Sequence, residues 1–228
     1  MIWTDTAFLL SKNRYNENSV IAEIYTERYG KKTGIIFGAS SKKIKNYLQI
    51  GNKIHVNYNV KDENSIGYFK VEILKPLAPF FFDDKKKLLC VSSAINLVKL
   101  LTVESQQNEQ IFKLIDDFYT YIKNKDWIKQ YILWELKFLK LIGYDLELKN
   151  LVSKQIENNN VKYFVISNSQ KRFVPNFLVE NSQNFIDKEN LLNGLKIVGD
   201  YLDKTILKPN NLSFPPSRIE LANLINQI

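Results

Sequence analysis

The hydrophobic pattern of this chain changes its period once, and that change constrains the fold more than any other feature. In 53–60, Ile54, Val56 and Tyr58 alternate with polar residues, and similar short patterns continue to residue 74. From residue 84 on, apolar residues recur at every third or fourth position. The alternating pattern predicts half-buried strands, and the longer spacing predicts helices. The sequence therefore predicts a β part followed by a mostly helical part.

Five segments of the first part have the alternating, β-branched or aromatic composition that is typical of strands. They span 3–11, 19–26, 31–38, 53–60 and 65–74, and turn-forming stretches separate them. Five short strands suit a small closed barrel, because closure leaves no sheet edge exposed. We predict an α+β protein whose residues 1–78 form a five-stranded OB-type β-barrel.

Two prolines interrupt the pattern in 75–82, and we place a domain boundary there, so that residues 79–228 form a mostly α-helical C-terminal domain. The predicted helices cover 84–103, 108–124, 126–142 and 188–207, and a last one begins near Ser217. Between them, 144–183 is irregular apart from a short strand at 161–166 and a second one near 172–174. The helix over 126–142 is apolar around most of its circumference, which is typical of a buried helix.

The inventory of reactive side chains excludes several classes of protein. The 228 residues include one Cys and one His, so neither an internal disulfide nor a Cys/His zinc cluster can form. The chain lacks the glycine-rich motifs of nucleotide-binding loops, and no Ser–His–acid arrangement can be assembled. We expect no enzymatic activity, no catalytic residue, no metal and no cofactor. With no membrane span and no secretory signal, we expect a cytoplasmic protein.

The basic residues gather in the first third of the chain. The net charge is +8, but the Lys and Asn enrichment is also typical of AT-rich codons, so position matters more than the total. No acid interrupts residues 28–61, and clustered cations favour phosphates because binding releases counterions. Aromatic side chains on an OB barrel add stacking faces for bases. We expect the nucleic-acid-binding residues to be Arg14, Arg28, Lys31, Lys32, Lys42, Lys43, Lys45 and Tyr47, with Tyr15 and Tyr29 as further stacking partners. The alternative is a solvated lysine-rich surface.

The remaining chemistry-bearing residues have simpler interpretations. Cys90 falls within a predicted helix, where we expect a small buried apolar residue. His55 alternates with apolar neighbours, so we expect it on the surface. Asp83 and Asp84 precede a helix, whose positive dipole end favours acids, with metal binding as the alternative. The aromatic residues of 126–142 recur at helical spacing and are expected in the core.

Four stretches and the tail of the chain together resemble one family. The stretches are LLSKNRYNENSVIAEIYTERYGKKTGIIFGASS (9–41), LQIGN (48–52), IGYFKVEIL (66–74) and YILWELKFLKLIGYDLEL (131–148), and the tail is LKPNNLSFPPSRIEL (207–221). The Trp–Glu–Leu helix and its end at a glycine are the most specific of these. In this order they resemble RecO, the family of bacterial recombination mediators, and in particular its alphaproteobacterial members.

The chain departs from the family pattern at two places. Some members carry a four-cysteine zinc site in the second domain, whereas the single cysteine here is Cys90 and none follows residue 150. A zinc role is therefore excluded. The arginine that is typical of the family after a Gly–Ala pair is Ser40 here, and the positive charge lies instead at Lys42 and Lys43.

The resemblance implies a non-enzymatic DNA-repair protein. It implies binding of single- and double-stranded DNA and annealing of complementary strands. It also implies contact with the acidic C-terminal tail of the single-strand binding protein and partnership with RecR in loading RecA, in the cytoplasm and at the nucleoid during repair. Two alternatives stay open: a generic OB-type RNA-binding protein without mediator activity, and a nuclease-like enzyme, which would need an acidic metal site that the sequence does not show.

Overall fold

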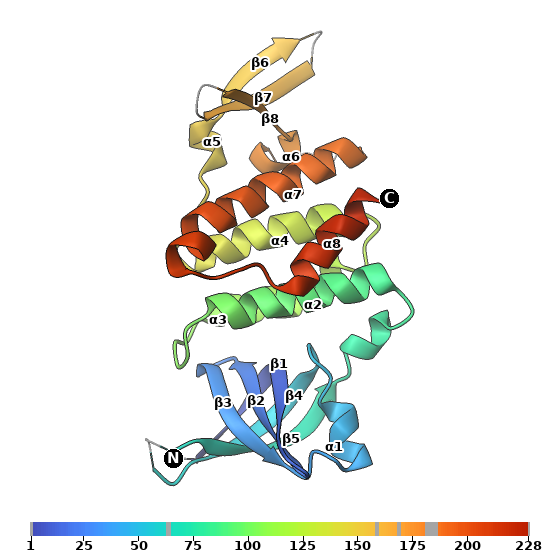
Figure 1. The fold of residues 1–228 in the computed structure, drawn as a ribbon, viewed down its shortest axis with the longest axis vertical. Helices are drawn as coiled ribbons and strands as arrows, with labels where there is room; N and C mark the ends of the chain where they lie inside the picture. Colours follow the sequence, from blue (N-terminus) through green and yellow to red (C-terminus); the bar gives the residue numbers. More distant parts are fainter. Residues whose placement is uncertain (1, 63–64, 158–159, 168–169, 181–186, 228) are drawn as a thin grey trace. The chain divides into compact units, whose positions relative to one another are not determined.

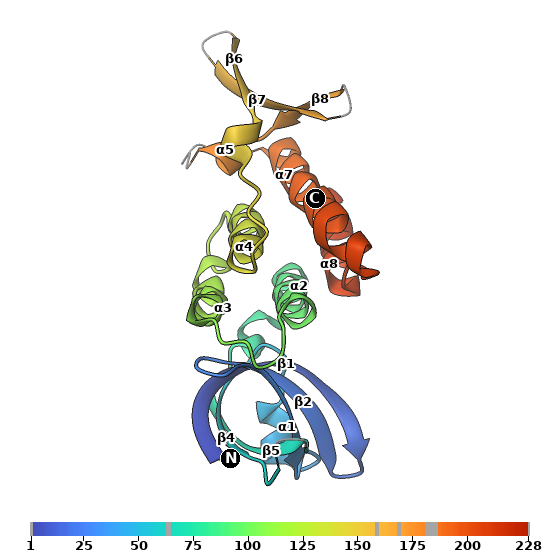
Figure 2. The same ribbon diagram turned by 90° about the vertical axis from the view of Figure 1, so that its left-hand side faces the viewer.

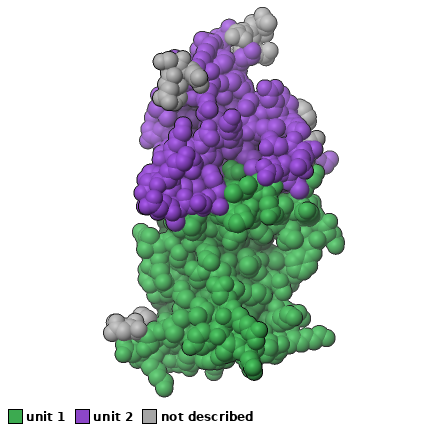
Figure 3. Space-filling view, viewed as in Figure 1, with its two compact units in different colours: residues 1–119, 215–221 green, residues 120–214, 222–228 purple. Residues whose placement is uncertain are grey.

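The computed structural model describes residues 2–62, 65–157, 160–167, 170–180 and 187–227 (Figures 1 and 2). The chain divides into two compact units, which Figure 3 distinguishes by colour. Unit 1 comprises residues 1–119 and 215–221, and unit 2 comprises residues 120–214 and 222–228.

Unit 1 contains a closed five-stranded barrel, as the alternating pattern predicts. Its strands are β1 (Ile2–Asn16), β2 (Ser19–Thr26), β3 (Gly30–Phe37), β4 (Lys53–Asn59) and β5 (Gly67–Lys75). They follow the order β1-β2-β3-β5-β4, in which β3 and β5 are parallel and the other neighbours antiparallel. The predicted OB-type barrel is therefore confirmed.

The long first strand closes the barrel by pairing with two neighbours. Residues 2–8 of β1 pair with β4, and residues 7–16 pair with β2. Two register irregularities in the β2 pairing, after Leu9 and after Arg14, allow the strand to bend between them. Alternation decides what faces the interior, so that Ile54 and Val56 of β4 are buried while His55 between them is exposed, as predicted.

Three helices of unit 1 accompany the barrel. The short α1 (Lys42–Tyr47) was not predicted, because it has too few residues to show a period; Ser41 caps it by accepting from the Ile44 amide. A 3-10 turn, η1 (Ala78–Phe81), leads into α2 (Lys85–Leu101), which is followed by α3 (Glu109–Tyr121). The Asp84 carboxylate accepts from the amides of Lys86 and Lys87, which confirms the predicted helix start. Cys90 lies buried in α2, also as predicted.

The barrel and these helices share buried aromatic contacts. Phe8 of β1 is fully buried, with ring centroids 5.0 Å from Phe112 and 6.0 Å from Tyr119 of α3. The Tyr119 hydroxyl donates to the Gly51 carbonyl at 2.5 Å. These contacts explain why α3 up to Tyr119 groups with the barrel in unit 1, and α2 also contacts β1. The boundary that we place after residue 78 follows a change of hydrophobic pattern and stays a prediction.

Unit 2 consists of helices and a small sheet. The helices are α4 (Trp127–Leu141), α5 (Leu148–Leu151), α6 (Asn176–Val179), α7 (Lys188–Leu202), the π-helical turn η2 (Asp203–Leu207), the 3-10 turn η3 (Lys208–Asn210) and the later part of α8 (Pro216–Asn226), which spans both units. Helix α4 packs against α7. Its Tyr131, Trp134 and Phe138 are buried, as predicted for core aromatics, whereas Trp127 in its first turn is half-buried.

The sheet of unit 2 has the antiparallel order β6 (Ser153–Glu157), β7 (Asn160–Ser167) and β8 (Gln170–Val174). The sequence predicts strands in the regions of β7 and β8. It misses β6, because SKQIE has a single apolar residue and shows no alternation. Among the described residues, none of the helices is long and apolar enough to cross a membrane.

Candidate nucleic-acid interface

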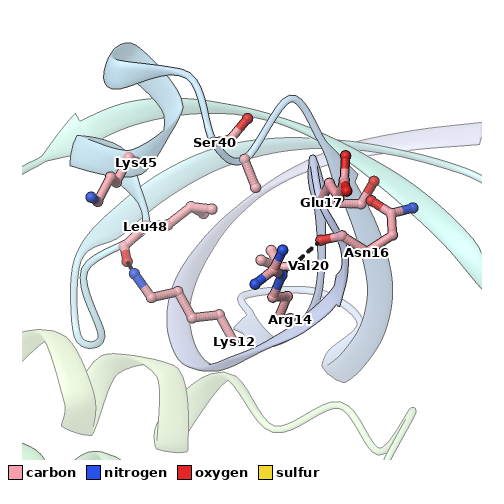
Figure 4. A pocket seen from close by; sticks show the side chains of 10 residues that line it. Lys12, Arg14, Asn16, Glu17, Val20, Ser40, Lys45 and Leu48 are labelled. Atoms are coloured by element: carbon pink, nitrogen blue, oxygen red, sulfur yellow. Dashed lines mark hydrogen bonds between the residues drawn. The ribbon is translucent and has the colours of Figure 1, made fainter.

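An open cavity of about 330 Å³ lies where β1 ends, β2 begins and α1 follows β3 (Figure 4). It is lined by Lys12, Arg14, Asn16, Glu17, Ser19, Val20, Ala39, Ser40, Lys45 and Leu48. Two of the sequence-predicted residues, Arg14 and Lys45, therefore meet here although 30 residues of chain separate them. Ser40, which stands where the family typically has arginine, lines the same cavity.

The cations around the cavity lie close enough to influence one another. Burial, and then repulsion from Lys45, lowers the pKa of Lys12 below its ordinary value of 10.5. The Lys12 ammonium donates to the Leu48 carbonyl, and Arg14 Nε donates to the Asn16 carbonyl at 3.3 Å. An anion placed among these groups would offset the repulsion from Lys45, which is the smaller of the two causes that lower the pKa of Lys12. The lining has three cations and one acid, Glu17, so its net charge is positive and suits a phosphate.

Helix α1 extends this positive surface. Lys42, Lys43 and Lys45 are all exposed on its six residues. Tyr47 at its end is half-buried, and its carbonyl accepts from Asn52 Nδ2 at 3.2 Å. The three lysines can therefore reach a ligand outside the barrel, whereas Tyr47 presents only part of its ring.

Arg28 and Tyr29 have partners in the barrel. Arg28 forms an ion pair with the buried Asp5, at 3.3 Å between Nε and Oδ1, and its backbone amide donates to the same carboxylate at 2.8 Å. The Tyr29 ring stacks on Trp3 with centroids 4.3 Å apart. Both residues therefore contribute to the barrel itself.

Lys31 and Lys32 lie at the other end of β3 from the cavity. Lys31 Nζ donates to the Lys99 carbonyl at 2.9 Å, and Lys32 Nζ donates to Ser105 Oγ at 2.7 Å. Burial lowers the pKa of Lys31, and the nearby Glu23 and Glu104 partly offset this effect. The basic run of the sequence is thus divided between two places, and these two lysines bond to the α2 end and the loop after it.

Sequence reasoning missed Lys12 and an aromatic pair beside the cavity. Lys12 precedes Arg14 by two residues on one strand, so the period of two could have placed both on one face. Phe37 of β3 is 59% exposed, and its ring centroid lies 6.1 Å from that of Tyr68 on β5. Phe37 pairs in register with Ser19, a cavity residue. No local signal in the sequence brings β3 and β5 together, so only the barrel topology reveals this pair.

The arrangement provides charge and stacking faces but no reaction centre. Among the residues that the structure describes, no three His, Cys, Asp or Glu side chains gather in a way that could hold a metal ion. Three cations around an open cavity, with the exposed Phe37 ring beside it, can bind a phosphate and an unpaired base.

Comparison with known proteins assigns both parts of the chain to one family. The family Recombination protein O N terminal matches residues 1–77, and Recombination protein O C terminal matches residues 83–213. Similar proteins include those of Ehrlichia chaffeensis, 24% identical over 99% of each chain, and Caulobacter vibrioides, 25% identical over 98% of this chain and 97% of the relative. The protein of Rhodospirillum centenum is 22% identical over 98% of this chain and 94% of its own length. Each of these relatives is named DNA repair protein RecO. The chain therefore belongs to the RecO family.

Proposed function

We propose that this protein is a recombination mediator in DNA repair, without enzymatic activity. It binds single- and double-stranded DNA, anneals complementary strands, and with RecR helps to load RecA onto DNA coated by single-strand binding protein. Family membership supports the role in DNA repair. The acidic tail of the single-strand binding protein and RecR are the protein partners that the resemblance implies.

The observation that carries the proposal is the convergence of cations on one cavity of the barrel. Lys12, Arg14 and Lys45 come from two separate elements, and the exposed Lys42 and Lys43 continue the positive surface. Neutralising strand phosphates releases counterions and lowers the repulsion between two complementary strands. Such a surface promotes annealing without ATP, because the pairing of bases supplies the driving force.

The aromatic pair gives the same surface a way to hold unpaired bases. Phe37 ends β3 and directly precedes the segment that contains the cavity residues Ala39 and Ser40. A strand whose phosphate occupies the cavity can therefore place a neighbouring base on the exposed Phe37 ring. Stacking of this kind tolerates any sequence, because every base has a π-face.

The proposal is tested by strand annealing. Complementary strands coated with the cognate single-strand binding protein are mixed with this protein without ATP, at two salt concentrations, and duplex formation is followed by fluorescence. We expect annealing that weakens at high salt and weakens further in Lys45→Glu. The matched control is Lys85→Glu, the same charge change at an exposed lysine of α2.

Three results would contradict parts of the proposal. Annealing that is equally slow in Lys85→Glu and Lys45→Glu would indicate a general effect of charge rather than a site at the cavity. Tight binding without annealing, above all with a preference for structured RNA, would favour the generic OB-type RNA-binding alternative. DNA breakdown that requires Mg²⁺ would favour the enzyme alternative.

A further inference from the structure

One face of the three-stranded sheet of unit 2 is covered around Tyr163 and Val174, while Lys154 and Ile156 of β6 on the same face stay exposed. The register places Lys154, Tyr163 and Val174 on this face, because directly paired residues of antiparallel strands point to the same side. Tyr163 and Val174 are buried, and the Tyr163 hydroxyl bonds to the Glu180 carboxylate after α6. Arg172, on the same face, forms an ion pair with Asp200 of α7 at 2.9 Å. The helices α6 and α7 therefore lie against this side.

The opposite face of the sheet, which we call the open face, combines aromatic and basic side chains. The register pairs Phe164 with Phe173, Ile166 with Lys171, and Lys162 with Gln155, and so assigns all six to this face. Ile166 is 71% exposed, Lys171 and Gln155 are exposed, and the two phenylalanines and Lys162 are half-buried. Phe164 and Phe173 keep partial access to solvent on a short, open sheet.

The side chains of the open face contact one another. The rings of Phe164 and Phe173 meet edge to face, with centroids 5.9 Å apart. Lys171 Nζ lies 4.0 Å from the Phe164 centroid and donates to Gln155 Oε1 at 2.6 Å. The contact holds an ammonium group beside an aromatic ring. A nucleotide presents the complementary pair, because its phosphate is a short distance from the π-face of its base.

We propose that the open face binds single-stranded DNA as a second surface, separate from the barrel. Unpaired bases stack on Phe164 and Phe173, and Lys162 and Lys171 contact the flanking phosphates. Aromatic residues on a sheet face with nearby cations are a general way to hold unpaired bases. Lysine is depleted at the core of protein–protein interfaces, so two lysines on the same face as the rings favour nucleic acid over a protein partner. A second surface would allow one molecule to hold both strands that are to be annealed.

The test compares variants of the two faces of this sheet in the full-length protein. Binding of fluorescein-labelled oligothymidine is measured by anisotropy for Phe164→Ala and Lys171→Glu. The matched control is Lys154→Glu, because Lys154 is an exposed lysine at a register position of the covered face. We expect the affinity to fall by about tenfold in Phe164→Ala, as for the loss of one stacked base. In Lys171→Glu, we expect the slope of log affinity against log salt concentration to fall by the equivalent of about one phosphate contact. We expect no such change in Lys154→Glu.

A second variant and a crosslink keep the proposal falsifiable if Phe164→Ala fails to fold. Phe164→Leu keeps the apolar bulk and removes the π-face, so it should also lower the affinity while the circular dichroism spectrum stays unchanged. Oligothymidine that carries photoreactive 4-thiothymidine should crosslink to peptides of β7 or β8. Unchanged affinity in Phe164→Leu, no crosslink to these strands, or equal losses in Lys154→Glu and Lys171→Glu would overturn the proposal. Unchanged DNA affinity together with lost binding of a partner protein would overturn it in favour of a docking face.

Double variants separate binding at the open face from binding at the cation-lined cavity of the barrel, which we call the barrel interface. In a Lys45→Glu background the barrel contribution is weakened, and the remaining affinity should still fall when Phe164 is replaced. If Lys45→Glu alone has no effect while Phe164→Leu lowers affinity, the barrel interface fails and the open face stands. If the reverse holds, the open face fails and the barrel interface stands.

Discussion

Gly34 of β3 and Gly67 of β5 pair directly across the single parallel junction of the barrel. An aromatic ring covers each of them. A Cβ atom added to Gly34 would lie 2.6 Å from the Phe69 ring, and one added to Gly67 would lie 2.3 Å from the Tyr58 ring. The barrel closes at this junction because both residues lack a side chain, which lets the two rings fill the interior beside the backbone.

Replacing either glycine should therefore destabilise the barrel. Gly34→Ala must displace the buried Phe69 ring, and overpacking of this kind costs about 1–3 kcal/mol of unfolding free energy. Chemical denaturation measures the loss. Combining Gly34→Ala with Phe69→Leu should recover part of it, because a smaller side chain leaves room for the methyl group. Simple additivity of the two losses would show that the ring is not the cause.

The barrel could be predicted from the sequence because its strands alternate, whereas the junction could not. The pattern of Ile54, Val56 and Tyr58 fixes the inward face of β4 locally. The pairing of β3 with β5 is a long-range relationship that no local period encodes, and Phe37 and Tyr68 meet only through it. The candidate site was predictable to the same extent. The basic run predicts binding residues in the segment that forms α1. Only the topology of the barrel places Lys45 in one cavity with Lys12 and Lys31 against α2.

The lowered pKa of Lys12 predicts a pH dependence of DNA binding. Burial and the charge of Lys45 lower this pKa below 10.5, so Lys12 loses its proton at a lower pH than an ordinary lysine. Phosphate binding needs the charged form, so the affinity should decline as the pH rises through the pKa of Lys12. In Lys12→Arg the group stays charged, and the decline should shift to higher pH. Anisotropy titrations over an alkaline pH series measure this, and identical profiles for both proteins would exclude Lys12 from the phosphate site.

The exposed ring of Phe37 predicts a difference between single strands and duplex. Phe37→Ala should weaken single-strand binding by about 1–3 kcal/mol, the usual contribution of one stacked base, and leave duplex binding nearly unchanged. Phe80→Ala is a matched control, because Phe80 is a 68% exposed phenylalanine on η1 and does not line the cavity. Quenching of 2-aminopurine in a single strand reports stacking directly. Equal effects on single strand and duplex would assign Phe37 a structural role.

Arg28 is predicted to matter for stability more than for DNA binding. It pairs with Asp5, which is 4% exposed, and Arg28→Ala removes this partner from a buried carboxylate. Because the Arg28 side chain itself is 58% exposed, solvent screening limits the loss to about 1 kcal/mol. Denaturation curves measure that loss, and anisotropy should give a DNA affinity close to that of the unaltered protein. A large loss of DNA affinity with an unchanged free energy of unfolding would show that Arg28 contacts DNA.

The lowered pKa of Glu23 predicts how the stability of unit 1 changes at acidic pH. Burial alone would raise the pKa of Glu23, but the hydrogen bond from Ser11 and the Lys99 ammonium at 2.9 Å outweigh it and lower the pKa below 4.5. A carboxylate with a lowered pKa stabilises the fold above its unfolded pKa, and this contribution is lost as the pH falls through the folded pKa.

Glu23→Gln should therefore unfold at a lower temperature than the unaltered protein near neutral pH, and the gap should narrow as the pH falls below 4.5. Glu27→Gln serves as the control, because Glu27 is an exposed carboxylate in the turn directly after the same strand, and the variant should melt like the unaltered protein throughout. Thermal melts over an acidic pH series measure the gap. A gap for Glu23→Gln that stays constant with pH would show that Gln disturbs packing and that the charge of Glu23 does not stabilise unit 1.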